Sequence, residues 1–122
     1  MRSSRERAGP AGEAAAVAYL RERGLRILDL DWRCRLGQVD IVCEDGDVLV
    51  VVEVKARRSA AFGPPQEAVD WRKQEKLRAL LHAYMAATGR RGRRCRIDVV
   101  AVLLDADLDP LRIDHIVSAV GG

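Results

Sequence analysis

The chain has 122 residues, of which 48% are hydrophobic and 32% are charged, and its formal net charge is +3 with a pI near 9.0. This length is close to the commonest size of a single domain, and the hydrophobic content excludes a disordered chain. No apolar run approaches the roughly 20 residues of a membrane-spanning helix, and the positive charge weakly favours a phosphate-bearing partner.

Residues 1–11 form a basic stretch that we interpret as a flexible tail in front of one domain over residues 12–122. Because the arginines of this stretch have no apolar segment behind them, we recognise no signal peptide and expect a cytoplasmic protein. A helix is predicted over about residues 12–23, with Gly24 as its terminating residue. Residues 25–32 are predicted as the first strand.

Two strands joined by a tight turn follow the first strand. Residues 39–43 and 48–54 are apolar and rich in β-branched side chains, which is typical of strands. Asp45-Gly46 lies between them and is a strong hairpin signal. We therefore predict an antiparallel pair with Asp45-Gly46 as its two-residue turn.

This register brings two carboxylates and one amine to one face of the sheet. Asp40 would lie opposite Val51, with Glu53 as its diagonal neighbour. Because side chains alternate along a strand, Glu53 and Lys55 share the face of Asp40. Diagonal neighbours lie about 7–8 Å apart at the backbone, a gap that two carboxylates can close by binding one cation.

The charges of Glu53 and Lys55 within an apolar strand need an explanation, because a charge buried without a partner is costly. Three arrangements satisfy them. The strand emerges into solvent at Glu53, or the two charges pair with each other, or Glu53 and Asp40 hold a metal ion. The presence of Asp40 on the same face favours the third arrangement.

A loop over residues 60–65 precedes a long helix that is predicted over residues 66–88 and ends at Gly89. Leucine, tyrosine and methionine side chains recur at helical spacing and belong to the core. Lys73 and Lys76 lie one turn apart on one edge of this helix. They are candidates for phosphate contact, with a solvated helix face as the alternative.

The remaining strands complete the domain. Residues 97–104 are strongly apolar, and a helical crossover would place them parallel inside the sheet, with Asp98 in a structural role. Residues 112–117 follow a turn-rich loop as a weak edge strand. The predicted order is α-β-β-β-α-β-β, an α/β domain with a mixed central sheet flanked by helices.

Cysteine and histidine offer little chemistry in this chain. Cys34, Cys43 and Cys95 are widely spaced without a Cys-x-x-Cys pair, so we interpret them as buried small hydrophobic residues. His82 and His115 stand alone and support no histidine-based mechanism.

Two arginine clusters are candidates for nucleic-acid contact. Arg57 and Arg58 directly follow the strand that bears Lys55, and phosphate contact is the better interpretation for them. The second cluster precedes the strand at residues 97–104, and a solvated surface is an equally good interpretation of it. Its members are Arg90, Arg91, Arg93 and Arg94.

Short motifs are spread over nearly the whole chain, from Gly12 to about Val120. They are Gly12-Glu13, Gly37-x-Val-Asp40, Val52-Glu-Val-Lys55-Ala-Arg57, Phe62-Gly63, Glu67-Ala-Val69 followed by Lys73 and Lys76, and Arg96-Ile-Asp-Val-Val100. In these motifs the chain resembles the YraN family of small bacterial proteins. That family belongs to the restriction-endonuclease-like superfamily, PD-(D/E)XK, and is similar in core to archaeal Holliday junction resolvases.

The resemblance implies a nuclease core in which Asp40 and Glu53 bind a divalent cation. The carbonyl of Val54 would be a further ligand, and Glu13 would supply an extra acid from the first helix. Mg²⁺ or Mn²⁺ suits such a site, because hard cations prefer carboxylate and carbonyl oxygens. Lys55 would orient or deprotonate a water, or stabilise the charge that builds on the phosphate.

Two residues depart from the family pattern. Gln38 stands where the family usually has glutamate, and Val39 stands where the wider superfamily often has proline. Because Gln38 falls on the face of Asp40, the site has one acidic neighbour fewer, and we expect weaker metal binding.

Three functions are compatible with the sequence. The first is a Mg²⁺- or Mn²⁺-dependent endonuclease that hydrolyses DNA, selective for a junction, flap or end rather than for base sequence, with RNA as another substrate class. Because one site cuts one strand, a two-fold homodimer would suit duplex targets. The alternative is a non-catalytic nucleic-acid-binding or adaptor protein that retains the nuclease fold. The third is a protein-interaction module in which the acids pair structurally.

Overall fold

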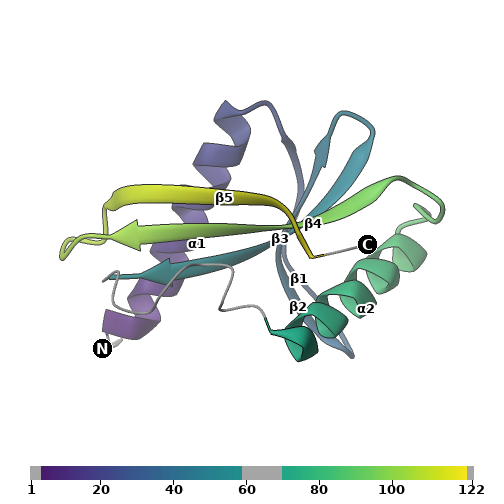
Figure 1. Ribbon diagram of the computed structural model, residues 1–122, viewed down its shortest axis with the longest axis horizontal. Coiled ribbons are helices and arrows are strands. Elements are labelled where there is room, and N and C mark those ends of the chain that lie inside the picture. The colour runs from purple at the N-terminus through teal and green to yellow at the C-terminus, as the bar shows by residue number, and fades with distance from the viewer. Residues whose placement is uncertain (1–3, 59–69, 121–122) are drawn as a thin grey trace.

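The predicted order of helices and strands is confirmed in the computed structural model, which describes residues 4–58 and 70–120 (Figure 1). The described elements are α1 (Ser4–Glu22), β1 (Arg26–Cys34), β2 (Gly37–Asp45), β3 (Val48–Arg57), α2 (Trp71–Ala87), β4 (Cys95–Leu104) and β5 (Pro110–Val120).

The strands form one mixed five-stranded sheet in the order β1-β2-β3-β4-β5. β3 and β4 are parallel, and α2 lies in the chain between them, so the predicted helical crossover is confirmed. The other neighbouring pairs are antiparallel. Parallel strands need a long connection, and α2 is part of it.

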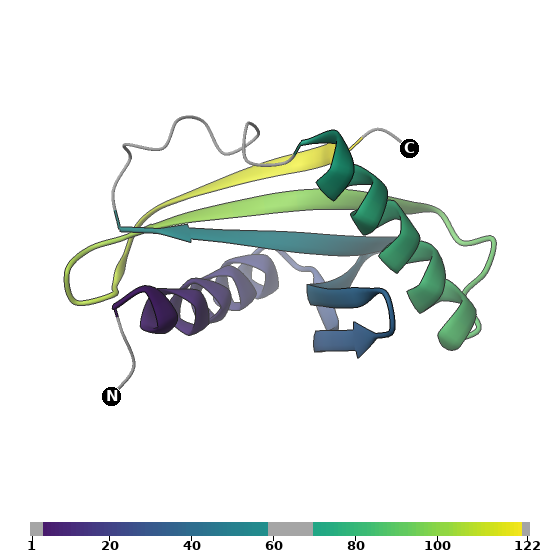
Figure 2. The same cartoon turned by 90° about the horizontal axis from the view of Figure 1, so that it is seen from below.

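Each helix covers its own face of the sheet (Figure 2). Val50 packs in one core cluster with Leu20 of α1, whereas Val51 packs in the other with Leu77 and Leu80 of α2. Because successive residues of a strand point to opposite faces, α1 and α2 cover opposite faces of β3. The apolar run in β3 is explained by this arrangement, since a strand that is covered on both faces needs hydrophobic residues at successive positions.

The first helix begins eight residues before its predicted start. Its bounds are Ser4–Glu22, so residues 4–11, which we interpreted as part of a flexible tail, are helical. Pro10 lies inside the helix. Arginine, glutamate and alanine are good helix formers, and they dominate this part of the chain.

Other boundaries shift by smaller amounts. β4 begins two residues earlier than predicted, and β5 extends the weak edge strand at both ends. The second helix begins at Trp71 with Asp70 as its N-cap, because the Asp70 side chain accepts a hydrogen bond from the Lys73 N–H. Residues 59–69, with the Phe62-Gly63 motif and the predicted loop, lie outside the described residues.

The turn between β2 and β3 differs from the prediction by one position. Asp45 pairs with Val48, so the two-residue loop is Gly46-Asp47 instead of Asp45-Gly46. Gly46 has φ +61°, and glycine is the residue favoured at the first loop position of a type II′ turn. The register of the hairpin therefore moves by two residues: Val51 pairs with Val42 instead of Asp40, and the last pair before Asp40 is Ile41 with Val52.

The cysteine prediction is only partly correct. Cys43 is buried, Cys34 is half-buried, and Cys95 is exposed because it begins β4 at the edge of the packed core. Within the described ranges, no helix is long and apolar enough to cross a membrane.

Candidate metal centre

The candidate site lies where β2 separates from β3. Their backbone pairing stops at Ile41 and Val52, and beyond it the Oδ2 atom of Asp40 accepts a hydrogen bond from the Val54 N–H at 2.9 Å. In Figure 1, β1 and β2 leave the centre of the sheet in a different direction from β3. A carboxylate thus replaces the missing strand pairing and occupies the fork between the two strands.

The alternation of side chains in β2 also changes at Asp40. Val39 and Val42 belong to the core cluster under α2, whereas Ile41 and Cys43 belong to the cluster under α1. A regular strand would place Val39 and Ile41 on the same face. The irregularity at Asp40 lets its carboxylate face groups that come from both sides of the sheet.

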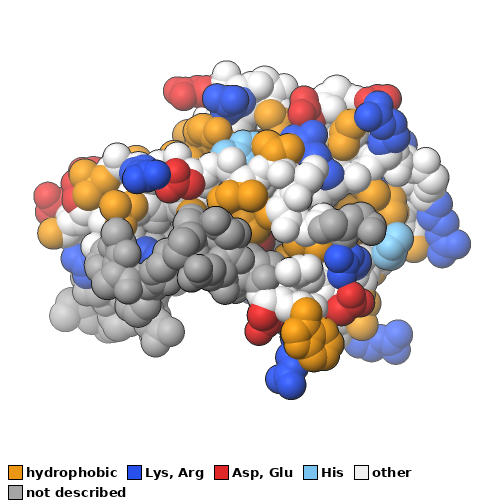
Figure 3. Space-filling model, in the orientation of Figure 1, with side chains coloured by type: hydrophobic (Ala, Val, Ile, Leu, Met, Phe, Trp, Pro, Cys, Tyr) orange, Lys and Arg blue, Asp and Glu red, His pale blue; other side chains and the backbone are white. Residues whose placement is uncertain are grey.

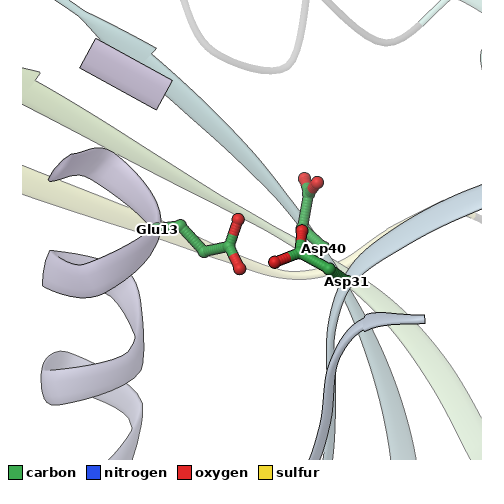
Figure 4. Close-up of side chains that lie close together, drawn as sticks. All are labelled: Glu13, Asp31 and Asp40. Atoms are coloured by element: carbon green, nitrogen blue, oxygen red, sulfur yellow. The ribbon is translucent and has the colours of Figure 1, made fainter. Parts of the chain in front are cut away.

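Three carboxylates meet at this fork. One oxygen from each of Glu13, Asp31 and Asp40 lies within 4.8 Å of the others. Figure 4 shows Glu13 pointing from α1 toward the two aspartates, which lie on neighbouring strands. The structure therefore brings together two predicted residues, Glu13 and Asp40, with a third acid that the sequence analysis missed.

Asp31 reaches the site because of the pairing between β1 and β2. Leu30 pairs with Ile41 and Trp32 with Val39, so Asp31 lies across from Asp40. Asp31 has φ +50°, a left-handed conformation that is uncommon for residues other than glycine. A signal for Asp31 exists in the sequence, since it is an acid within a predicted strand, but its partner depends on the register.

Gln38 takes a specific part in this arrangement. Its Nε2 atom donates a hydrogen bond to Oδ1 of Asp31 at 2.6 Å. The amide at this position therefore stabilises the charge of Asp31 where a glutamate would repel it.

Glu13 is held close to the sheet by the glycine before it. A Cβ atom on Gly12 would lie 2.4 Å from the Cβ of Ala56 in β3, far inside van der Waals contact. The absence of a side chain at Gly12 lets α1 approach β3 and carries Glu13 toward the fork.

Burial and nearby acids raise the pKa values of Glu13 and Asp40. Burial, then a side-chain hydrogen bond with Asp31, and then the charges of Asp31 and Asp40 raise the pKa of Glu13 to about 7. Burial is also the main reason why the pKa of Asp40 rises to about 6, and the charge of Glu53 adds to it, while the Val54 hydrogen bond acts in the opposite direction. Like charges held together in this way favour the binding of a proton or a cation.

Glu53 lies beside this cluster among amines. It is 7% exposed, and its Oε1 atom lies 3.2 Å from the Nζ of Lys73 and 3.7 Å from the Nζ of Lys55. Of the three arrangements considered for these charges, the structure therefore contains the ion pair. Glu53 is not one of the three acids whose oxygens lie within 4.8 Å, but its charge acts on Asp40.

The predicted phosphate-contacting residues fall into two regions. Arg57 and Arg58 lie at the end of β3 beyond Lys55, and Arg58 donates to the carbonyl of Ala106 at 3.1 Å. Lys76 lies over Gly37 at the start of β2, one helical turn after Lys73. Arg57 thus lies four residues beyond Glu53 along β3, and Gly37 lies three residues before Asp40 along β2.

The second arginine cluster lies at the opposite end of β3, beside the turn at Gly46. Arg93 pairs with Glu44 at 2.7 Å, and Arg94 lies 3.9 Å from Asp47. The pKa of Glu44 is lowered by its hydrogen bonds to Arg26 and Arg93. The structure therefore does not bring Arg90, Arg91, Arg93 and Arg94 to the acidic site.

Asp98 forms a separate network under α1. It has no exposed surface, and it binds Arg96 at 3.1 Å, His115 Nε2 at 2.8 Å and the Ser118 N–H at 2.9 Å. His115 also lies 3.3 Å from the hydroxyl of Tyr19. These contacts join β4, β5 and α1, which agrees with a structural role.

Comparison with known proteins identifies one family. The family described as "Uncharacterised protein family UPF0102" matches residues 12–102. A UPF0102 protein of Moorella thermoacetica is 50% identical over 105 residues, which is 86% of this chain and 88% of the relative. A UPF0102 protein of Pelotomaculum thermopropionicum is 44% identical over 119 residues, 98% of this chain and 99% of the relative. A Rhodococcus jostii relative is 43% identical over 108 residues, 88% of this chain and 91% of its own length.

Proposed function

The chain belongs to the uncharacterised protein family UPF0102, and from this premise we propose that it is a divalent-metal-dependent nuclease with a restriction-endonuclease-like core. The observation that carries the proposal is the position of Asp40 in the fork between β2 and β3. It is tied to Val54, faces Glu13 and Asp31, and is within electrostatic reach of Glu53.

The donor set fits Mg²⁺ or Mn²⁺. The acids at the fork offer carboxylate oxygens, which hard cations prefer. Burial is the main cause of the raised pKa values of Glu13 and Asp40, and the charges of neighbouring acids add to it. Asp40 and Glu53 would hold the cation, with the Val54 carbonyl, Glu13 and Asp31 as further oxygen donors.

Phosphodiester hydrolysis needs an activated water and compensation of the charge that develops on the phosphate. A divalent cation lowers the pKa of water and neutralises phosphate charge when it is bound. Lys55 would orient the attacking water or stabilise the developing charge, because its amine lies beside Glu53 and its side chain is 28% exposed. Asp40 would keep Val54 in place through its hydrogen bond while this chemistry proceeds.

The proposed substrate is DNA, recognised by its structure. Arg57 and Arg58 follow Lys55 along the chain, and Lys76 lies one helical turn after Lys73; these residues would contact phosphates, which carry no sequence information directly. Aromatic residues make up only 4% of the chain, so there is little to stack on unpaired bases. A junction, flap or end read through its backbone is therefore favoured, and a two-fold homodimer would place one site on each strand.

The test is a cleavage assay with Mg²⁺ and separately Mn²⁺ on labelled single-stranded, duplex, flap and four-way-junction DNA. Glu53→Gln and Lys55→Ala are expected to abolish cutting. Glu75→Gln, which alters an exposed acid paired with Arg78, is the matched control and should cut normally. Cutting that persists in both site variants would refute the assignment of this site.

A second candidate function is a non-catalytic nucleic-acid-binding protein that keeps this fold. The observation in its favour is that Glu53 is already paired with two lysines, and Asp31 with Gln38. This candidate predicts that the protein binds DNA equally well with and without metal and that Asp40→Asn leaves this binding unchanged. A titration of DNA binding with and without Mg²⁺ distinguishes it from the nuclease.

A further inference from the structure

The first turn of α2 carries a lysine into the acidic site. Oδ1 of Asp70 accepts a hydrogen bond from the Lys73 N–H at 2.9 Å, which makes Lys73 the third residue of the helix. From this position its Nζ lies 3.2 Å from Oε1 of Glu53, closer than the 3.7 Å of Lys55, the lysine of the strand motif.

The position of Lys73 is unfavourable for the helix itself. The first turn of α2 contains Arg72 and Lys73 and no acidic residue. The N-terminus of a helix carries a partial positive charge, which favours acids and disfavours lysine. Acidic and basic side chains lie next to each other over this end of α2 (Figure 3). The ion pair with Glu53 offsets the cost of placing Lys73 at the N-terminus of the helix.

The ion pair matters more for the charge of Glu53 than for that of Lys73, because Glu53 is buried and Lys73 is partly exposed. Glu53 is 7% exposed, whereas the Lys73 side chain is 33% exposed and has access to water. A buried carboxylate without a counter-charge is strongly destabilising. Through its charge Lys73 also lowers the pKa of Asp40, so one ammonium acts on both carboxylates that would hold a metal.

We propose that Lys73 is an exchangeable counter-ion of the acidic site, which neutralises Glu53 in the metal-free protein and leaves this carboxylate when a divalent cation binds. The inference rests on the proposed function, because it takes Asp40 and Glu53 as the metal ligands. The partly exposed ammonium, once displaced, is available to a substrate phosphate. Metal binding and phosphate binding are thereby coupled through one side chain.

The test measures the affinity for Mn²⁺ alone, by titration calorimetry on the full chain. Lys73→Met keeps the length of the side chain but removes its charge, and we expect Mn²⁺ to bind about tenfold more tightly, because a nearby positive charge no longer opposes the cation. Lys73→Arg keeps the charge and should bind as the wild type does. Arg72→Met is the control, because it removes a charge from the same helical turn. The Arg72 side chain lies over the Trp71 ring, and among the described residues no contact between Arg72 and Glu53 is found. This variant should therefore change the affinity for Mn²⁺ less than twofold.

Two results would overturn the inference, and they differ in what they mean for the proposed metal site. If the wild type binds Mn²⁺ and Glu53→Gln does not, but Lys73→Met binds equally or more weakly, then Lys73 is a structural partner and the proposed metal site remains. If neither the wild type nor any variant binds Mn²⁺, the inference and the metal-dependent function both fail. Thermal unfolding of each variant establishes that all of them are folded.

Discussion

The carboxylate of Asp40 accepts a hydrogen bond from the Val54 N–H at 2.9 Å, so one side chain both closes the fork between β2 and β3 and faces the other acids. Because Asp40 serves the fold and the site at once, substitutions there need to separate charge from hydrogen bonding.

Asp40→Asn should remove metal binding without unfolding the protein. The amide oxygen can still accept the Val54 hydrogen bond, while loss of the charge removes repulsion from Glu13 and Glu53. We expect the unfolding temperature at pH 8 without metal to be equal to or higher than that of the wild type. Millimolar Mn²⁺ should raise it for the wild type but not for the variant. Asp47→Asn, at an exposed acid on the opposite end of β3, is the control and should respond to Mn²⁺ normally.

The metal-free protein should lose stability as the pH rises from about 4 to 7. In the folded protein the pKa of Glu13 is raised from 4.5 to about 7 and that of Asp40 from 3.8 to about 6. A raised folded pKa means that the folded state binds more protons, so this contribution is fully present below the unfolded pKa and is lost as the pH passes the folded one. Urea unfolding between pH 4 and 8 measures it.

Glu13→Gln should flatten this pH profile, whereas Glu75→Gln, at an exposed position, should leave it unchanged. A wild-type profile that rises over the same range would contradict the arrangement of the acids. Added Mg²⁺ should stabilise the protein more at pH 8 than at pH 5, since the ligands must be deprotonated.

Gly12→Ala should destabilise the protein and weaken Mn²⁺ binding at the proposed site. The new methyl group would lie 2.4 Å from the Cβ of Ala56, so α1 must move away from β3 and take Glu13 with it. We expect a loss of about 1–3 kcal/mol in the free energy of unfolding. Chemical denaturation and Mn²⁺ titration measure the two effects.

Two controls make this prediction specific. Gly9→Ala lies in the same helix, and its new Cβ would have no described atom within 4 Å apart from the neighbouring backbone of its own helix, so it should be neutral or stabilising. The double variant with Ala56→Gly removes the opposing methyl group and should recover much of the lost stability. No recovery would mean that the close approach of α1 and β3 is not the cause.

Asp98→Ala should unfold or strongly destabilise the protein for a reason unrelated to chemistry. It would leave Arg96 and His115 without their buried partner, at a cost of about 3–5 kcal/mol. Asp114→Ala removes an exposed pair with Arg112 and should cost less than about 1 kcal/mol. Denaturant unfolding compares the two variants, and equal losses would contradict a structural role for Asp98.

Much of the fold follows from local sequence patterns. Each of three patterns depends only on residues that are close in the chain: the apolar run from Val48 to Val54, the glycines at the ends of the first and second helices, and the apolar strand at residues 97–104. They therefore predicted the α-β-β-β-α-β-β order and the parallel crossover, both of which are confirmed. The helix start at Ser4 was missed because caps and propensities define the ends of helices only weakly.

The register of the central hairpin shows where local patterns stop being sufficient. Asp45-Gly46 and Gly46-Asp47 are both acceptable turns, and the two choices differ by two residues in pairing while keeping the same faces. The sequence therefore placed Asp40 and Glu53 on adjacent strands, but it did not predict that pairing stops at Ile41 and Val52 or that the alternation of side chains changes at Asp40.

The sequence by itself determined the chemical inventory of this protein: Asp40, Glu53 and Lys55 on two adjacent strands, with Glu13 as a further acid from the first helix. Only the tertiary structure decided that Asp31 completes the acid cluster, that Gln38 supports it, and that Lys73 reaches Glu53. The physical reason is that these contacts join segments distant in the chain. Their geometry depends on how β2 diverges from β3 and how closely each helix packs, which no local periodicity encodes.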